Sequence, residues 1–189
     1  MDYFDNMPQK PQWLRNCAIG LAALMLSACS SVQPLATVDY VDLERFMGDW
    51  YVIGNIPTSI ETEAYNAVES YQLDEDGSIA TTFTFNKGGF EGKQKRYTPR
   101  GFVRNTDTNA VWGMQFIWPI KADYRIIYLD DDYQLTVVGR NKLDYVWVMA
   151  RSPSISDARY DEMMALIEGV GYDMSKMRKV PQQVGRARQ

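Results

Sequence analysis

Residues 110–118 read Ala-Val-Trp-Gly-Met-Gln-Phe-Ile-Trp, and this stretch decides the fold class. Large apolar side chains recur at every second position, with a glycine and a glutamine between them. Because successive side chains of a strand point to opposite faces, a period of two predicts a β-strand with one apolar face. That face would carry Trp112, Met114, Phe116 and Trp118.

Seven further runs of β-forming residues surround this stretch at roughly ten-residue spacing, separated by turn signals such as Asp74-Glu75-Asp76-Gly77. Eight strands joined in order by short loops form an antiparallel meander, which closes best as an up-and-down barrel. The sequence therefore predicts an all-β, eight-stranded antiparallel up-and-down β-barrel. The expected strands are 49–56, 64–73, 78–85, 95–104, 110–118, 122–129, 133–139 and 144–151.

Alternation in these strands also predicts which side chains face the barrel interior. A stripe of this kind on its own favours a solid core. The number of strands favours a ligand site instead, because eight strands leave room for one small ligand, and aromatic linings suit an apolar ligand with one polar end. The ligand-facing residues we predict are Glu69, Tyr71, Thr81, Phe83, Met114, Phe116, Tyr124, Ile126, Val137, Tyr145 and Trp147.

Glu69 is the one acidic residue of this set. A buried unpaired carboxylate is costly. Glu69 therefore lies at the open mouth, pairs with a ligand or a basic group, or belongs to a strand whose register is shifted by one residue.

After Pro153 the apolar period changes from that of a strand to that of a helix. Ser154 or Ser156 can cap a helix that runs to about Gly169. Its apolar face would carry Tyr160, Met163, Ile167 and Val170 and would pack on the outside of the barrel. Residues 176–189 are basic and polar and are expected to be extended or frayed.

The N-terminal segment reads as a secretion signal. Lys10 and Arg15 precede an apolar run over 17–26, which is about half the length that a membrane-spanning helix needs. We expect residues 1–28 to form a signal peptide, with Met7 as an alternative start.

Leu26-Ser27-Ala28-Cys29 resembles the bacterial lipobox, whose cysteine is acylated and becomes the first mature residue. The alternative is an ordinary cleaved signal with an incidental cysteine. Acylation would hold the protein stably on a bilayer. Ser30, in place of an aspartate, implies sorting to the outer membrane. Residues 29–41 would then be a lipidated tether and residues 42–189 the folded domain.

Composition excludes several function classes. The net charge is −4 with scattered basic residues, so we expect no nucleic-acid partner. The chain has no histidine, which removes Ser-His and Cys-His catalytic pairs and histidine-ligated zinc and haem. No pair of acidic residues falls on one inward register. We therefore predict no catalytic residues, metal site or cofactor.

Three segments resemble the signatures of the lipocalins, in particular the bacterial outer-membrane lipocalins. Gly48-Asp49-Trp50-Tyr51 is similar to the first signature at the start of the first strand, and Leu129-Asp130-Asp131-Asp132-Tyr133 to the second between strands six and seven. The third is similar to 145–153, in which Arg151 ends the last strand. The resemblance covers essentially the whole mature chain.

The resemblance gives Gly48, Trp50 and Arg151 a structural role. Trp50 would close the narrow end of the barrel, and the Arg151 guanidinium would stack on its ring, a cation–π contact worth about 1–2 kcal/mol when desolvated.

The function implied is binding, storage or transport of a fatty acid, lysophospholipid or similar lipid by an outer-membrane lipoprotein that is not an enzyme. Two alternatives are an enzyme, which the absence of histidine and of a free cysteine disfavours, and a structural lipoprotein with a filled barrel and no ligand. The sequence leaves open whether two copies pair as a homodimer.

Overall fold

The structure is a computed structural model that describes residues 33–183. The expected signal peptide and the lipobox with Cys29 lie outside the described residues. Within them, no helix is both long and apolar enough to cross a bilayer.

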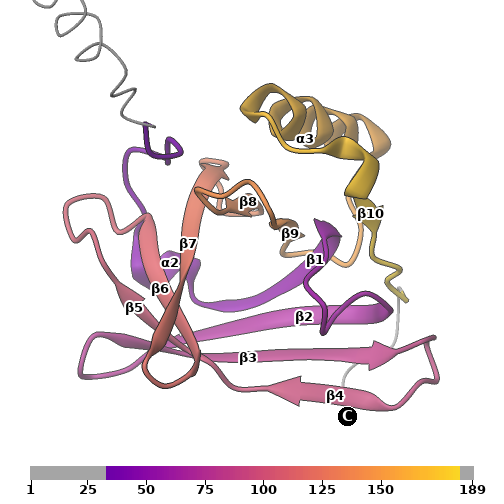
Figure 1. Cartoon of the computed structure of the whole chain (residues 1–189), viewed down its shortest axis with the longest axis horizontal. Coiled ribbons are helices and arrows are strands. Elements are labelled where there is room, and N and C mark those ends of the chain that lie inside the picture. The colour runs from indigo at the N-terminus through magenta and orange to yellow at the C-terminus, as the bar shows by residue number, and fades with distance from the viewer. Residues whose placement is uncertain (1–32, 184–189) are drawn as a thin grey trace, which may run out of the picture. The chain divides into compact units, whose positions relative to one another are not determined.

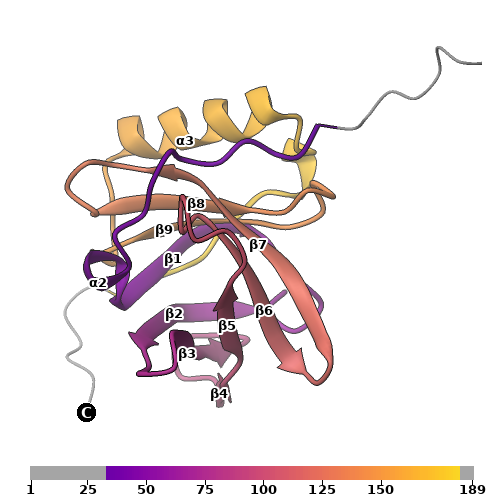
Figure 2. The ribbon, with the colours of Figure 1, turned by 90° about the vertical axis from the view of Figure 1, so that its left-hand side faces the viewer.

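An antiparallel β-barrel forms the body of the molecule (Figures 1 and 2). The strands are β1 (Gly48–Ile56), β2 (Ala64–Leu73), β3 (Ser78–Lys87), β4 (Gln94–Tyr97), β5 (Arg100–Val103), β6 (Val111–Ile117), β7 (Ile120–Leu129), β8 (Leu135–Gly139) and β9 (Val146–Ala150). Neighbouring strands pair in chain order, with β4 and β5 both paired to β3, and β9 pairs back with β1, which closes the barrel and confirms the predicted fold.

One predicted strand, 95–104, is split into β4 and β5, which both pair with β3 and together occupy one position in the barrel. The break falls at Pro99, which has no backbone N–H to give to the ladder. The Pro99 carbonyl accepts a hydrogen bond from the Thr81 N–H instead. The strand predicted over 133–139 begins later, at Leu135, because Tyr133 sits in a turn with φ of 58°.

Helix α3 (Asp157–Val170) packs on the outside of the barrel beside β8 and β9 (Figure 2). Ser156 is its N-cap and accepts a hydrogen bond from the Arg159 N–H, which decides between the two predicted caps. Met163 and Ile167 are fully buried, and Tyr160 and Val170 pack beside them, as the helical period predicted. The short helix η2 (Met174–Lys176) and strand β10 (Arg178–Lys179), which pairs with β1, follow it.

Two apolar clusters stabilise this arrangement. One fills part of the barrel interior, and the other lies between the barrel wall and α3. Val137 belongs to the outer cluster, whereas its neighbour Val138 belongs to the inner one, so the predicted inward orientation of Val137 is wrong. Every residue of β8 is buried because the helix covers the outer face of this strand. A strand buried on both faces shows no alternation from which its register can be read.

The narrow end of the barrel is closed by α2 (Leu43–Phe46) and the predicted structural residues. Trp50 is fully buried, and the Arg151 guanidinium carbon lies 3.9 Å from the centre of its ring. Arg151 also donates hydrogen bonds to the carbonyl oxygens of Arg45, Phe46, Met47 and Asp49 at 2.8–3.0 Å. Gly48 adopts φ of 93°, and a Cβ there would come within 3.3 Å of Arg151, which explains the glycine.

Candidate ligand-binding pocket

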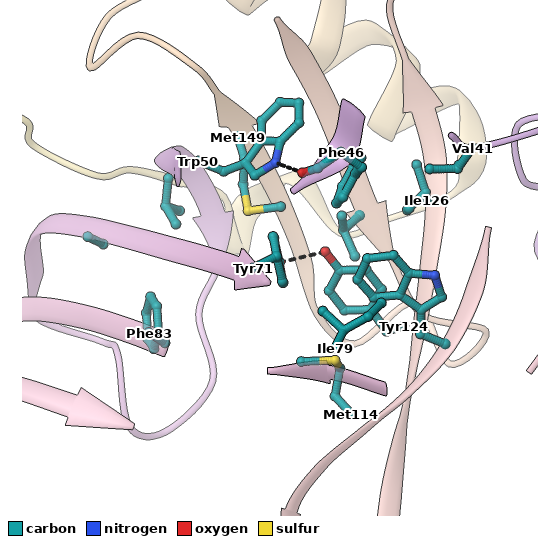
Figure 3. Packing of buried hydrophobic residues seen from close by; sticks show 14 of the residues in the cluster. Val41, Phe46, Trp50, Tyr71, Ile79, Phe83, Met114, Tyr124, Ile126 and Met149 are labelled. Carbon is teal, nitrogen blue, oxygen red and sulfur yellow. Dashed lines mark hydrogen bonds between the residues drawn. The ribbon is translucent and has the colours of Figure 1, made fainter. Parts of the chain in front are cut away.

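The half of the barrel nearest α2 is filled by side chains (Figure 3). Trp112 stacks on Tyr124 with ring centres 5.0 Å apart and meets Tyr71 edge-on at 5.7 Å. The Tyr71 and Tyr124 hydroxyl oxygens lie 2.6 Å apart, so these buried phenols satisfy each other. Burial raises the pKa of both tyrosines well above the usual value, which keeps them neutral. Together with the side chains packed around them, these rings form a solid layer across the barrel, which we call the aromatic floor.

Above this floor lies a cavity of about 450 Å³ that opens at the other end of the barrel. Its size is within the range of pockets that hold small molecules. Six of the predicted residues line it: Glu69, Phe83, Met114, Phe116, Tyr124 and Trp147.

The other predicted ligand-facing residues do not line this cavity. Tyr71 and Ile126 belong to the packed floor, and Thr81 is buried with its hydroxyl bonded to the Ile79 carbonyl. Tyr145 precedes β9 and packs with the outer cluster, beneath the Arg140 guanidinium. The predicted orientation of Tyr145 is wrong because alternation was extended past the start of β9, at Val146.

Several lining residues were missed by sequence reasoning. They are Thr58, Ser59, Ile60, Glu61, Tyr97, Ile117, Ala122, Asp123 and Arg140. Most lie in loops or at strand ends, where a period of two has no meaning. Tyr97 was not predicted as a lining residue because the break at Pro99 separates β4 from β5 and interrupts the alternation of the expected strand. A cluster of apolar and charged residues in the loop over 57–63 was the available signal.

Three acidic residues line the cavity, contrary to the expectation that no acidic pair shares the interior. Asp123 is paired with Arg125 at 3.1 Å, whereas Glu61 and Glu69 have no basic partner in the lining. Glu61 is 5% exposed, and it accepts hydrogen bonds from the Thr58 N–H and hydroxyl and from the Trp147 indole N–H. It therefore fastens the β1–β2 loop to β9, the strand that pairs with β1. Burial raises the pKa of Glu61 in spite of these bonds.

Glu69 stands on β2 opposite Trp50 and Phe83 on the adjacent strands, which confirms the predicted register. Loss of solvent raises the pKa of the Glu69 carboxyl to about 7. A hydrogen bond with Tyr71 lowers this pKa, and the charge of Glu61 raises it further. A carboxyl in this state is protonated about half of the time near neutral pH. The cavity can thus present a neutral wall to an apolar chain.

Arg140 is the basic residue of the cavity lining and lies near the mouth. Its guanidinium is 3.4 Å from the Asp144 carboxylate and 5.2 Å from the centre of the Tyr145 ring. Its buried Nε makes no hydrogen bond within the described residues. The cavity therefore combines an apolar interior with a cation at its entrance. No group of three or more Asp, Glu, Cys or His side chains over 33–183 is arranged to hold a metal ion.

Comparison with known proteins gives consistent matches in sequence. Residues 41–182 match the family model described as a lipocalin-like domain. The outer membrane lipoprotein Blc of Escherichia coli strain K12 is 30% identical over 164 residues, which span 84% of this chain and 91% of that protein. Temperature-induced lipocalin-1 of Arabidopsis thaliana is also 30% identical, over 78% of this chain and 83% of that protein.

Solved structures agree on the fold. Apocrustacyanin C2 superposes with a TM-score of 0.60 at 11% identity, over 76% of this chain and 81% of that one. Insecticyanin from the tobacco hornworm Manduca sexta superposes with a TM-score of 0.59 at 14% identity, over 80% and 89%. At these identities the likeness concerns the fold alone.

Proposed function

This chain belongs to the lipocalin-like family, and proteins of this family generally bind hydrophobic ligands. We propose that it carries a long-chain lipid in the cavity above its aromatic floor. Fatty acids and lysophospholipids are the lipid classes proposed. The protein acts by binding and not by catalysis, since the oxygens of Glu61 are occupied by hydrogen-bond donors that hold its loop.

The proposal includes a location at the outer membrane, held by acylation of Cys29. It is supported by the order Leu26-Ser27-Ala28-Cys29 at the end of an apolar run and by relatives that are named outer membrane lipoproteins. Mass spectrometry of the mature protein tests it directly, because acyl chains on the N-terminal cysteine add a defined mass. A mature N-terminus other than Cys29, or an unmodified Cys29, would contradict this part of the proposal.

The observation that carries the lipid proposal is the open cavity itself. A structural lipoprotein with a filled barrel would have side chains throughout the interior, whereas here only the closed half is filled. Burying an acyl chain of about fourteen methylenes gains on the order of 10 kcal/mol before the costs of association. Affinity in the micromolar range or tighter follows.

Charge placement suggests how the lipid would lie. An anionic head group would be repelled by Glu61 and by the ionised form of Glu69 inside the cavity, and attracted by Arg140 at the mouth. The acyl chain would therefore enter first, with protonated Glu69 beside it. A fatty-acid carboxylate and a lysophospholipid phosphate share this arrangement.

Native mass spectrometry with an organic extract tests the function. Residues 30–189, purified without the lipidation cysteine, should retain a bound lipid that the extract identifies. The mass spectrum of Met114→Trp should show protein without bound lipid, because Met114 lines the cavity and a larger side chain would fill it. Tyr40→Ser, which alters an exposed side chain outside the lining, is the matched control. An empty wild-type protein that also fails to bind fluorescent fatty acids at micromolar concentration would favour the filled-barrel alternative.

A further inference from the structure

Large apolar side chains are concentrated at the tip of the β6–β7 hairpin. The exposed fractions are 51% for Phe116, 73% for Ile117, 82% for Trp118 and 68% for Ile120. Trp118, predicted to continue the inward stripe of its strand, instead lies beyond the end of β6. Clustering of this kind on a folded protein marks a surface that is covered by something else.

This apolar tip is continuous with the cavity. Phe116 and Ile117 line the cavity while exposing more than half of their surface, and Ile60, 40% exposed on the β1–β2 loop, also lines it. We call these five residues, Ile60, Phe116, Ile117, Trp118 and Ile120, the rim patch. Of the large hydrophobic side chains exposed over 33–183, only Tyr40 lies outside it. Whatever covers the rim patch thus also faces the cavity mouth.

The tether joins the barrel at this same end. The Leu35 N–H donates to the Asn141 side chain at 2.8 Å, and the Leu35 carbonyl accepts from Arg125 at 3.3 Å. Asp123 and Arg140, sequence neighbours of these two partners, line the cavity.

The length of chain before Leu35 limits what can lie near the mouth. Leu35 is six residues after Cys29, and a fully extended chain of six residue steps spans about 20 Å. If Cys29 is acylated, Leu35 stays within about 20 Å of the bilayer surface, and Leu35 is bound at the same end of the barrel as the rim patch. The membrane is then permanently present at this end of the barrel, whereas a second copy must arrive by diffusion.

We propose that the rim patch inserts into the interface of the lipid bilayer, so that the cavity opens onto the membrane. Tryptophan favours the interfacial region, and the neighbouring isoleucines favour the acyl boundary. Because the net charge is −4, the contact is apolar and not electrostatic. A lipid would then move between bilayer and cavity without crossing water. This inference rests on the proposed anchoring at Cys29 but not on the identity of the ligand.

Fluorescence quenching of Trp118 tests the insertion. The mature acylated protein is reconstituted into phosphatidylcholine vesicles and into matched vesicles whose acyl chains carry bromine. Of the other tryptophans of the mature chain, Trp50 and Trp112 are fully buried and Trp147 lies inside the cavity, so Trp118 is the most exposed to the bilayer and quenching should fall mainly on it. We expect the fractional loss of fluorescence in the wild type to be at least twice that in Trp118→Phe. Equal losses in the two proteins would overturn the proposal.

Partitioning of the unacylated protein tests the patch without the anchor. Cys29→Ser protein should bind plain phosphatidylcholine vesicles weakly and with little dependence on salt. Adding Ile117→Ser and Ile120→Ser should lower the partition coefficient at least fivefold, while Tyr40→Ser, an equally exposed apolar residue outside the patch, should leave it unchanged. An equal loss with Tyr40→Ser, or no loss with the isoleucine variant, would contradict the proposal.

Sedimentation without lipid distinguishes the membrane from a second copy of the chain. If Cys29→Ser protein sediments at twice its monomer mass and the isoleucine variant sediments as a monomer, the rim patch is a dimer interface and the proposal fails. None of these three measurements depends on whether the cavity holds a ligand. A mass spectrum without bound lipid would therefore contradict lipid carriage but not the membrane contact. Absence of acyl chains on Cys29 would remove the anchoring on which this inference rests and would therefore count against it as well.

Discussion

At the scale of single residues, Glu69 links the electrostatics of the cavity to the stability of the barrel. Its folded-state pKa of about 7 exceeds the ordinary value of 4.5, so the folded protein holds a proton that the unfolded chain has lost between these values. Stability then decreases as the pH rises from about 4.5 to about 7, because ionising Glu69 is harder in the folded state. The cost reaches on the order of 2–3 kcal/mol above neutral pH.

Glu69→Gln should remove this pH dependence. The variant should be more stable than the wild type by on the order of 2 kcal/mol at pH 8, and the two should be nearly equal at pH 4.5. Urea denaturation at both pH values measures the difference. Glu75→Gln, in an exposed turn, serves as the control and should leave the profile unchanged. A wild type whose stability does not fall across this range would show that Glu69 is ionised in the folded state.

Arg151 concentrates several interactions in one side chain. It donates hydrogen bonds to five backbone carbonyls and stacks on Trp50, and only a planar guanidinium provides both. Arg151→Lys should therefore destabilise the protein by about 2–4 kcal/mol. Arg159→Lys, in a more exposed pair with Asp130, should cost less than about 1 kcal/mol. Thermal and urea melts compare them, and equal losses would mean that Arg151 contributes only its charge.

At the scale of elements, α3 determines how the outer cluster is held. Its cap can be tested because the chain offers a matched pair of serines. Ser156→Ala should cost about 1 kcal/mol, since the Arg159 N–H loses its acceptor, whereas Ser154→Ala should be nearly neutral. Urea denaturation of both variants measures the difference. A larger loss from Ser154→Ala would show that the helix begins earlier.

Predictability also differs among the elements, for physical reasons. Strands with one buried face, such as β2, show alternation, and their inward residues were predicted correctly. Buried on both faces, β8 gave no such signal, so Val137 was placed inside while Val138 faces the interior. The three signatures placed the closed end, including the Trp50–Arg151 contact. Loops were unpredictable because their side chains are positioned by tertiary contacts, as the bonds from Glu61 to Trp147 show.

At the scale of the whole molecule, the barrel consists of a packed half and a hollow half. The packed half holds the aromatic floor, α2 and the Arg151 bonds, whereas the hollow half holds the cavity and the rim patch. Whether a given inward residue contacts ligand or packs in the floor depends on its height along the barrel axis. Alternation along a strand does not encode height, which is why Tyr71 and Ile126 were predicted as ligand contacts although they lie in the floor.

The aromatic floor has a consequence for how such a chain can change over generations. Since most of the buried contacts lie below the cavity, substitutions among the lining residues alter the shape and charge of the cavity while leaving the closed end intact. Selection can therefore test new cargoes at one end of the barrel without endangering folding at the other. The same separation makes this barrel a suitable starting scaffold for engineering receptors for other apolar molecules.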